Sequence, residues 1–438
     1  MHIGLRRAGV AAVVVFALTA GHAAQAADQT VPGAGNAAAA ALAGKSPLVA
    51  SALTRLQQQV STASSGRLRE QTEDAVFNPN TCVTHRARLT LADKQAIMAQ
   101  LLGEGLYNPA DAAGIEGRAM AGVFPPVIDD GSPCPHVPQA FGTAPGSNFG
   151  GHHSYPGGLA VHESFNLSSG LSFEQNYKLN FGMTGADGLP HVAPLPPFGP
   201  LSAAQESDLP IDHDLVMLAP IWHDWAKTMV FQWNADGTEF TEFNFGGNGS
   251  TDNYGAAGDS RTGGHHIIGV AEAMARELPP AFVIAQACAH SAPTLGNEYK
   301  VVNWLRAAAI LARVDPVTRG YLHTDASGHL RLPPVRTGDA VDMNAAGQPS
   351  ILAEDEIHNL SDADYVFSIP AVTEAQVLLQ ALAGSYNYDP GNATVYNTMY
   401  RNPAFTFLGP ERLLIVYAHG GLNAVRKELD HLRGLGVI

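Results

Sequence analysis

Histidine and acidic residues occur together at four places in the chain, each within or beside an apolar segment. The first two places are 152–163 (HHSYPGGLAVHE) and 218–227 (LAPIWHDWAK). The third combines 263–269 (GGHHIIG) with 287–290 (ACAH), and the fourth is 360–366 (LSDADYV). Imidazoles combined with carboxylates suit a borderline or hard divalent cation such as Mn, Fe, Ni, Co or Zn. The candidate ligands include no thiolate, so we do not expect a structural zinc finger.

The doublet His223-Asp224 is the firmest part of this pattern. Because the two residues are neighbours, one backbone position offers both an imidazole nitrogen and a carboxylate that can bridge two ions. One metal with open positions can activate a water, and two metals about 3.5–4 Å apart can hold the attacking and leaving oxygens of a phosphoryl group. A second doublet, His213-Asp214, is interpreted as a structural pair at a helix start.

The four segments, taken in order, resemble the motifs of the HD-domain metal-dependent phosphohydrolases. HHSYPGGLAVH resembles the HHxYxGGLLEH signature, HDWAK the HDxGK motif, and GHHIIG the GHExxG segment. AHS falls where the next histidine is expected, and SDADYV is similar to the closing ADxL helix. The similarity covers residues 150–370, about half of the chain. Each motif is weak alone, whereas four in the family's order form a strong joint signal.

The resemblance implies a set of metal ligands and catalytic residues. The implied ligands, which favour two ions over one, are His162, His223, Asp224, His265, His290 and Asp364. Lys227 matches the family's lysine, which holds a phosphate oxygen or stabilises developing charge. We therefore expect Lys227, Asp224 and His153 to take part in catalysis, with His152 and His153 contacting substrate or bracing the site.

Several of these assignments leave an alternative open. Asp364 is preferred because Val366, two residues further on, takes the family's apolar position; Asp362 is the alternative ligand or a charge at a helix N-terminus. His266 competes with His265. His290 is either a ligand or a buried histidine bonded to the backbone. Lys227 is either a catalytic residue or a solvated surface lysine.

The sequence also departs from the family pattern. Ala226 replaces the usual glycine, Val161 replaces the common glutamate before the first histidine, and Ser291 stands where some members carry a second imidazole. The long interval between His162 and His223 implies an insertion, which makes the first ligand less certain than the doublet.

The leading hypothesis is an exported metal-dependent hydrolase of phosphate esters, either phosphomonoesters or phosphodiesters, that uses a metal-activated water. The alternative is a di-iron oxygenase resembling inositol oxygenase, whose ligand order fits equally well. A further alternative is a degenerate HD domain that serves as a binding module.

The elements that must position these residues are expected to be mainly helical. The resemblance implies an all-α HD-domain core with long loops and small β-hairpin insertions. Apolar spacing predicts helices over 46–72, 91–102, 159–167, 215–230, 265–276, 280–290, 299–313, 362–383 and 424–435. Hairpins are expected within 232–245 and 321–332. The glycine-rich segment 246–264 is either a mobile flap or a surface connection.

The ends of the chain suggest its compartment and domain limits. Residues 1–26 have the charged start, apolar core and Ala-Gln-Ala end of a cleaved signal peptide, which predicts a periplasmic or secreted protein with no stable membrane insertion. An N-terminal extension of helices and loops (27–150), the HD-type metal-binding domain (151–390) and a C-terminal helical extension that packs on the core (391–438) would follow.

Charge and cysteine content narrow the partners. The net charge of -15, without a Lys/Arg block, argues against a nucleic-acid surface, so the expected partner is a small phosphate ester; the oligomeric state is left open. Of the three cysteines, Cys82 and Cys134 can pair in an oxidising compartment, whereas Cys288 is expected to be a buried free thiol.

Overall fold

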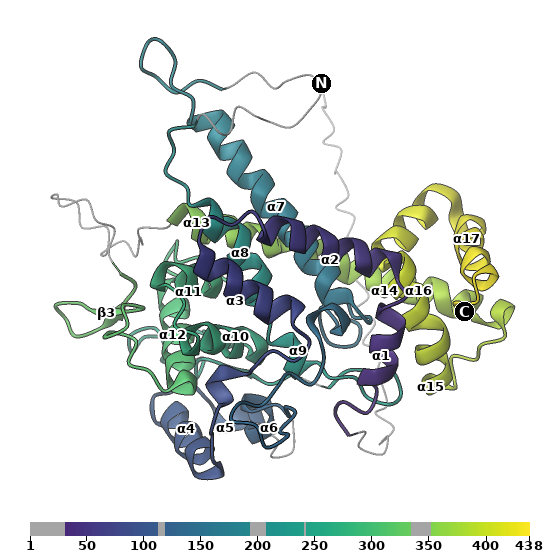
Figure 1. Ribbon diagram of the computed structural model, residues 1–438, viewed down its shortest axis with the longest axis horizontal. Helices are drawn as coiled ribbons and strands as arrows, with labels where there is room; N and C mark the ends of the chain where they lie inside the picture. The colour runs from purple at the N-terminus through teal and green to yellow at the C-terminus, as the bar shows by residue number, and fades with distance from the viewer. Residues whose placement is uncertain (1–30, 113–118, 193–206, 241, 334–351) are drawn as a thin grey trace, which may run out of the picture. The chain divides into compact units, whose positions relative to one another are not determined.

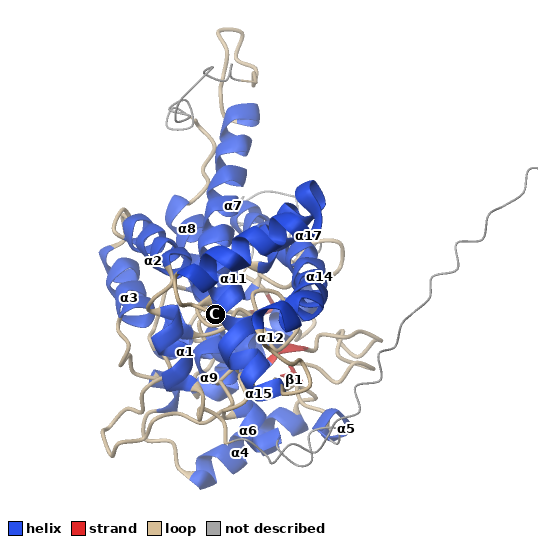
Figure 2. Ribbon diagram, turned by 90° about the vertical axis from the view of Figure 1, so that its right-hand side faces the viewer, coloured by secondary structure: helices blue, strands red, loops and turns tan. Residues whose placement is uncertain are grey.

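Helices form most of the described chain, and the strands are short (Figures 1 and 2). The structure is a computed structural model that describes residues 31–112, 119–192, 207–240, 242–333 and 352–438. The expected all-α class is thereby confirmed at this level. The predicted signal peptide lies outside the described residues. Residues Val31–Ile438 form one unit.

Five N-terminal helices contribute to the first hydrophobic core. They are α1 (Asn36–Ala43), α2 (Pro47–Val60), α3 (Gly66–Phe77), α4 (Leu91–Gly103) and α6 (Ala119–Val123), and the short helix α5 (Pro109–Ala112) lies between the last two in the sequence. The single helix predicted over 46–72 is wrong, because α2 ends at Val60 and α3 starts at Gly66 after the N-cap Ser65. The helix predicted over 91–102 is confirmed, and Thr90 caps it in a capping box with Asp93.

The same core contains six further helices, of which α7, α8 and α10 carry candidate ligands. They are α7 (Gly158–Phe181), α8 (His213–His223), α9 (Lys227–Val230), α10 (Gly264–Ala275), α11 (Pro280–Ala287) and α12 (Glu298–Ala312). Helix α13 (Leu352–Ser361) packs against α7, α8 and α11. The helix predicted over 215–230 is interrupted, because α8 ends at His223 and Asp224 is its C-cap. This break places the His223-Asp224 doublet at the C-terminal end of α8.

A second hydrophobic core unites α14 (Tyr365–Ala383) with the C-terminal helices α15 (Ala393–Tyr396), α16 (Asn402–Leu408) and α17 (Pro410–Gly434). The π-helical turn Asn397–Arg401 links α15 to α16. α14 packs against α17 (Figure 1). α17 begins well before the predicted residue 424 and breaks at Gly421. Tyr155, from the HHSYPGG segment, is buried in this second core.

Two small antiparallel sheets occur among the described residues: β1 (Asn244–Phe245) with β2 (Thr262–Gly263), and β3 (His323–Thr324) with β4 (Leu330–Arg331). The hairpin predicted within 321–332 is confirmed. Within 232–245, a short antiparallel turn spans 232–240, with a bridge between Trp233 and Glu239 and hydrogen bonds from Phe240 N to Gln232 O and from Asn234 N to Thr238 O, while Asn244–Phe245 pair elsewhere. β1 pairs instead across the glycine-rich segment, which brings β2 directly to the start of α10.

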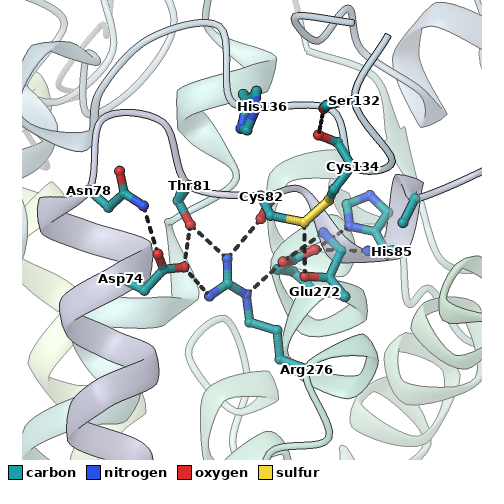
Figure 3. The surroundings of a disulfide bond; sticks show 12 residues. Asp74, Asn78, Thr81, Cys82, His85, Ser132, Cys134, His136, Glu272 and Arg276 are labelled. Carbon is teal, nitrogen blue, oxygen red and sulfur yellow. Dashed lines mark hydrogen bonds and ion pairs between the residues drawn. A yellow bond between two sulfur atoms is a disulfide. The ribbon is translucent and has the colours of Figure 1, made fainter. Parts of the chain in front are cut away.

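Cys82 and Cys134 form a disulfide, and Cys288 is a buried free thiol, as expected. Beside the disulfide, Arg276 donates to Asp74, Thr81, the Cys82 carbonyl and Glu272 (Figure 3). Glu272 also accepts hydrogen bonds from Thr84 N and His85 N. The network ties the disulfide segment to the end of α10.

The continuous helical stretch Ala353–Tyr386 is long and apolar enough to span a membrane by length and composition, and 44% of its most apolar window is buried inside the protein. Because core helices of this length pass the same test, the stretch carries no argument for a membrane here.

Candidate metal centre

Five segments bring the chemistry-bearing side chains to one buried place. His162 comes from α7, His223 ends α8, and His265 lies in the first turn of α10. His290 follows α11, and Asp362 and Asp364 lie in the 3-10 turn between α13 and α14. The structure therefore brings together all of the residues that the sequence nominated as ligands.

Local packing fixes the orientation of the doublet. His223 Nδ1 donates to the carbonyl of Pro220 at 2.7 Å, which leaves Nε2 directed at the centre. A Cβ on Gly269 would stand 3.1 Å from the His223 carbonyl oxygen, so a glycine allows α10 to lie close against the end of α8.

Asp224 lies at the centre of the cluster and is fully buried. Its Oδ1 lies 3.3 Å from His223 Nε2 and 3.0 Å from His265 Nε2. Its Oδ2 lies 3.1 Å from His162 Nε2 and also contacts Lys227 Nζ. The two carboxylate oxygens therefore face different histidines, which is the arrangement of a bridging ligand.

Asp362 and Asp364 lie on different sides of His162. Asp362 Oδ1 is 3.4 Å from His162 Nε2 and 3.3 Å from His223 Nε2, and its Oδ2 is 4.0 Å from His290 Nε2. Asp364 instead faces the other ring nitrogen, His162 Nδ1, at 3.2 Å. Geometry thus places the alternative, Asp362, among the inward-facing donors, with Asp364 behind His162.

The donor atoms fit a bound cation. The side-chain atoms His223 Nε2, Asp224 Oδ1 and His265 Nε2 are buried without a hydrogen-bond partner. Buried polar atoms are normally satisfied, so a convergent set of unsatisfied ones requires an explanation such as an ion. Two overlapping groups can hold metal: His162, Glu163, His223 and Asp224, and separately Asp224, His265 and His290. Asp362 forms a further group with His223 and His290.

Charges inside the cluster perturb one another strongly. Burial alone would lower the pKa of His223, but the surrounding carboxylates, Asp224 foremost, raise it to about 10. Burial would raise the pKa of Asp224, yet His223 and Lys227 hold it well below its usual range. Burial raises the pKa of Glu163 to about 8. At neutral pH the Asp224 carboxylate is therefore ionised in a buried place, where a cation would stabilise it, whereas Glu163 is mainly protonated.

The remaining nominated residues have distinct positions. Lys227 is buried rather than solvated, and its Nζ donates to the Gly146 carbonyl at 2.5 Å as well as to Asp224. The His153 ring lies 5.2 Å from that of His162. His266 donates to the Ala287 carbonyl and stacks on His290, so His265 is the inward-facing member of that pair.

Supporting residues were missed by the sequence analysis. Glu242 Oε1 accepts hydrogen bonds from both His265 Nδ1 (2.5 Å) and His265 N (2.8 Å). Thr262 Oγ1 hydrogen-bonds His290 Nδ1 at 2.7 Å, and His290 therefore bonds to a side chain while its Nε2 faces the centre. Glu242 and Thr262 reach these histidines through the β1–β2 pairing, which no motif spacing indicates.

No protein family, curated protein or solved structure matches this chain.

Proposed function

We propose that this chain is a metal-dependent phosphohydrolase built on an HD-type helical core. The observation that supports the proposal is the position of Asp224, whose two oxygens face separate histidines and whose Oδ1 is buried without a hydrogen-bond partner, as are His223 Nε2 and His265 Nε2. This geometry supports the same interpretation as the order of the sequence motifs, because the four motif segments, which are far apart in the chain, meet at the His223-Asp224 doublet.

The residues present suit two cations that share Asp224. The first would be held by His162, His223, Asp224 and Asp362, and the second by Asp224, His265 and His290. When bound, such ions supply Lewis acidity that activates water and offsets the charge of a phosphoryl group. Nitrogen and carboxylate donors fit Mn, Fe, Ni, Co or Zn.

The protein's own groups would orient the ester and balance its charge. Lys227 holds Asp224 in place and puts a buried positive charge beside it, where it can stabilise a phosphoryl oxygen. The side chain of His290 is 25% exposed, whereas those of His162 and His223 are fully buried. We therefore infer that substrate approaches from the His290 side.

The test uses p-nitrophenyl phosphate and bis(p-nitrophenyl) phosphate with Mn²⁺-, Co²⁺- or Zn²⁺-loaded protein. We expect hydrolysis by the wild type and loss of nearly all of it in His223→Ala. His213→Ala is the matched control, because it alters the other His-Asp doublet, whose histidine is half exposed and bonded to Glu174. Equal hydrolysis by wild type and His223→Ala would overturn the proposal.

A di-iron oxygenase is the second candidate, since a shared carboxylate between two histidine groups suits two irons equally well. Oxygen consumption by iron-loaded protein, without phosphate release from any ester, would favour it. Retention of no metal at all would favour the binding-module reading.

Export remains part of the proposal. The disulfide between Cys82 and Cys134 supports an oxidising compartment, because such bonds rarely persist in the cytosol. The substrate would then be an ester present outside the cytoplasm.

A further inference from the structure

Asn166 is a buried amide inside the candidate metal centre, and no motif of the sequence assigns it a role. It follows His162 by one turn of α7, so the two side chains lie on the same face of that helix. The residue has no exposed surface. Asn166 therefore belongs to the wall of the centre rather than to the protein surface.

The amide nitrogen of Asn166 stands among the polar atoms of the centre. Nδ2 donates to Asp362 Oδ1 at 3.3 Å and to Glu163 Oε2 at 3.4 Å. It also lies 3.2 Å from His162 Nε2. An amide NH2 group carries two hydrogens, so it can serve both carboxyl groups at once. Asn166 thus connects α7 to the 3-10 turn that carries Asp362.

The amide oxygen of Asn166 has no comparable contact, because Oδ1 is buried without a hydrogen-bond partner. Burying an unpartnered polar atom is unfavourable, and a leucine of similar size would fill the same position without that cost. Packing therefore does not account for an asparagine at this position, whereas hydrogen bonding by Nδ2 does.

The hydrogen bond from Nδ2 becomes more important once ions are bound. Asp362 Oδ1 also lies 3.4 Å from His162 Nε2 and 3.3 Å from His223 Nε2. A ring nitrogen that coordinates a metal uses its lone pair and carries no hydrogen, so neither histidine can then donate to the carboxylate. Among the described residues, Asn166 is the side-chain donor that Asp362 would keep.

We propose that Asn166 is a positioning residue of the metal centre, whose amide holds Asp362 in place as a ligand of the first ion. A carboxylate oxygen has two lone pairs, so Oδ1 can accept from Nδ2 and still bind the ion. Asp364 lies on the other side of His162, at Nδ1, so the same amide favours Asp362 over Asp364 as the ligand. The inference rests on the metal centre of the proposed function, but not on which ester is cleaved.

The experiment measures Mn²⁺ affinity by competition with a chelator of known affinity, in the absence of any ester. Asn166→Leu should bind one of the two ions about 10- to 100-fold more weakly than the wild type, as is typical when the partner of a ligand is lost. Asn180→Leu is the matched control, because it makes the same change on α7 at an exposed amide that bonds the Asn176 carbonyl. Its affinity should match that of the wild type.

Thermal unfolding of the metal-free chains separates positioning from a structural role. Asn166→Leu should unfold at nearly the same temperature as the wild type, because leucine fills the position. Wild-type affinity in Asn166→Leu would overturn the proposal, and so would a loss of affinity that only accompanies unfolding.

A crystal structure of the Mn²⁺-loaded wild type gives a second readout that needs no variant. Asp362 should bind the ion and accept from Asn166 Nδ2; an ion bound by Asp364 instead, or an amide turned away from Asp362, would overturn the proposal. The result is separable from the proposed function. If Asn166→Leu weakened Mn²⁺ binding as expected while the wild type cleaved no phosphate ester, the positioning role would stand and the hydrolase would not.

Discussion

Helix α10 carries buried charged groups at both of its ends, and the two ends are satisfied very differently. At the C-terminal end of α10, Glu272 accepts hydrogen bonds from Thr84 N, His85 and Arg276, so both oxygens of its carboxylate have partners (Figure 3). At its start, His265 Nε2 and the Asp224 Oδ1 that it faces are equally buried but have no hydrogen-bond partner.

The contrast separates a structural network from a ligand site. Burying charge is unfavourable unless the group is paired and hydrogen-bonded, and the Glu272 network meets that requirement with the protein's own atoms. In the Asp224 cluster, Lys227 pairs with Asp224 Oδ2, but Asp224 Oδ1, His223 Nε2 and His265 Nε2 are left without a hydrogen-bond partner, so these convergent donors could hold an ion. The two His-Asp doublets differ likewise: Asp214 accepts from Ser64 N, Ser64 Oγ and Ser65 N, whereas Asp224 Oδ1 faces histidines without a hydrogen bond.

The largest expected effect is the loss of metal and of hydrolysis in Asp224→Asn. Removing the shared carboxylate should cost several kcal/mol of transition-state stabilisation, roughly 1,000-fold or more in kcat/KM. Metal content and phosphoester hydrolysis would be measured together.

Asp214→Asn is the matched control for that variant. It should keep the metal and the activity while losing about 1–2 kcal/mol of folding free energy through its weakened hydrogen bonds to Ser64 and Ser65. If both doublets behaved alike, the distinction between them would fail.

Arg276→Met should lower the free energy of unfolding but leave metal binding unchanged. It leaves the buried Glu272 carboxylate without its cation, and breaking such a pair costs about 3–5 kcal/mol. Urea unfolding would show the loss, whereas the folded fraction at low temperature should bind as much metal per chain as the wild type. A metal deficit in that fraction would mean that the two ends of α10 are not independent.

The pH dependence of stability should reveal the Glu272 network. Burial would raise the pKa of Glu272, but the hydrogen bond from His85 and the charge of Arg276 lower it from 4.5 to about 2. Its contribution is therefore complete above pH 4.5 and is lost as the pH falls toward 2, on the order of 3 kcal/mol. Unfolding free energies at pH 6 and pH 3 should differ less in Glu272→Gln than in the wild type; an identical difference would contradict the assignment.

The smallest effect on metal binding, short of no change, is expected for Glu242→Gln. The amide can still accept from His265 Nδ1 but no longer carries the charge that makes the imidazole a stronger donor to metal. Loss of such a supporting carboxylate lowers metal affinity about 10- to 100-fold. A competition titration against a chelator of known affinity would measure it, with the unfolding free energy as the control for structure. Unchanged affinity would remove Glu242 from the site.

The sequence was sufficient for the elements that follow helical periodicity and for the segments that meet at Asp224. It favoured Asp364 over Asp362, whereas the geometry places Asp362 among the inward-facing donors, because the 3-10 turn directs the two carboxylates to opposite nitrogens of His162. Glu242 could not be predicted as a partner of His265, because strand pairing across a long loop brings the two residues together.

The C-terminal helices share a hydrophobic core with α14, because α14 packs against α17 and α17 packs against α16. No composition change marks this packing, because both faces of α14 are apolar enough to be buried. For the same reason Glu411, far along the chain, was not expected beside His153.

The most direct test of the central claim is an anomalous difference map of crystals of the wild-type chain, recorded at the absorption edge of the metal that the purified protein retains. The account predicts density on both sides of the Asp224 carboxylate, one peak toward His162 and His223 and the other toward His265 and His290. A protein that retains no metal, and shows no peak at Asp224 after soaking with Mn²⁺ or Zn²⁺, would contradict it.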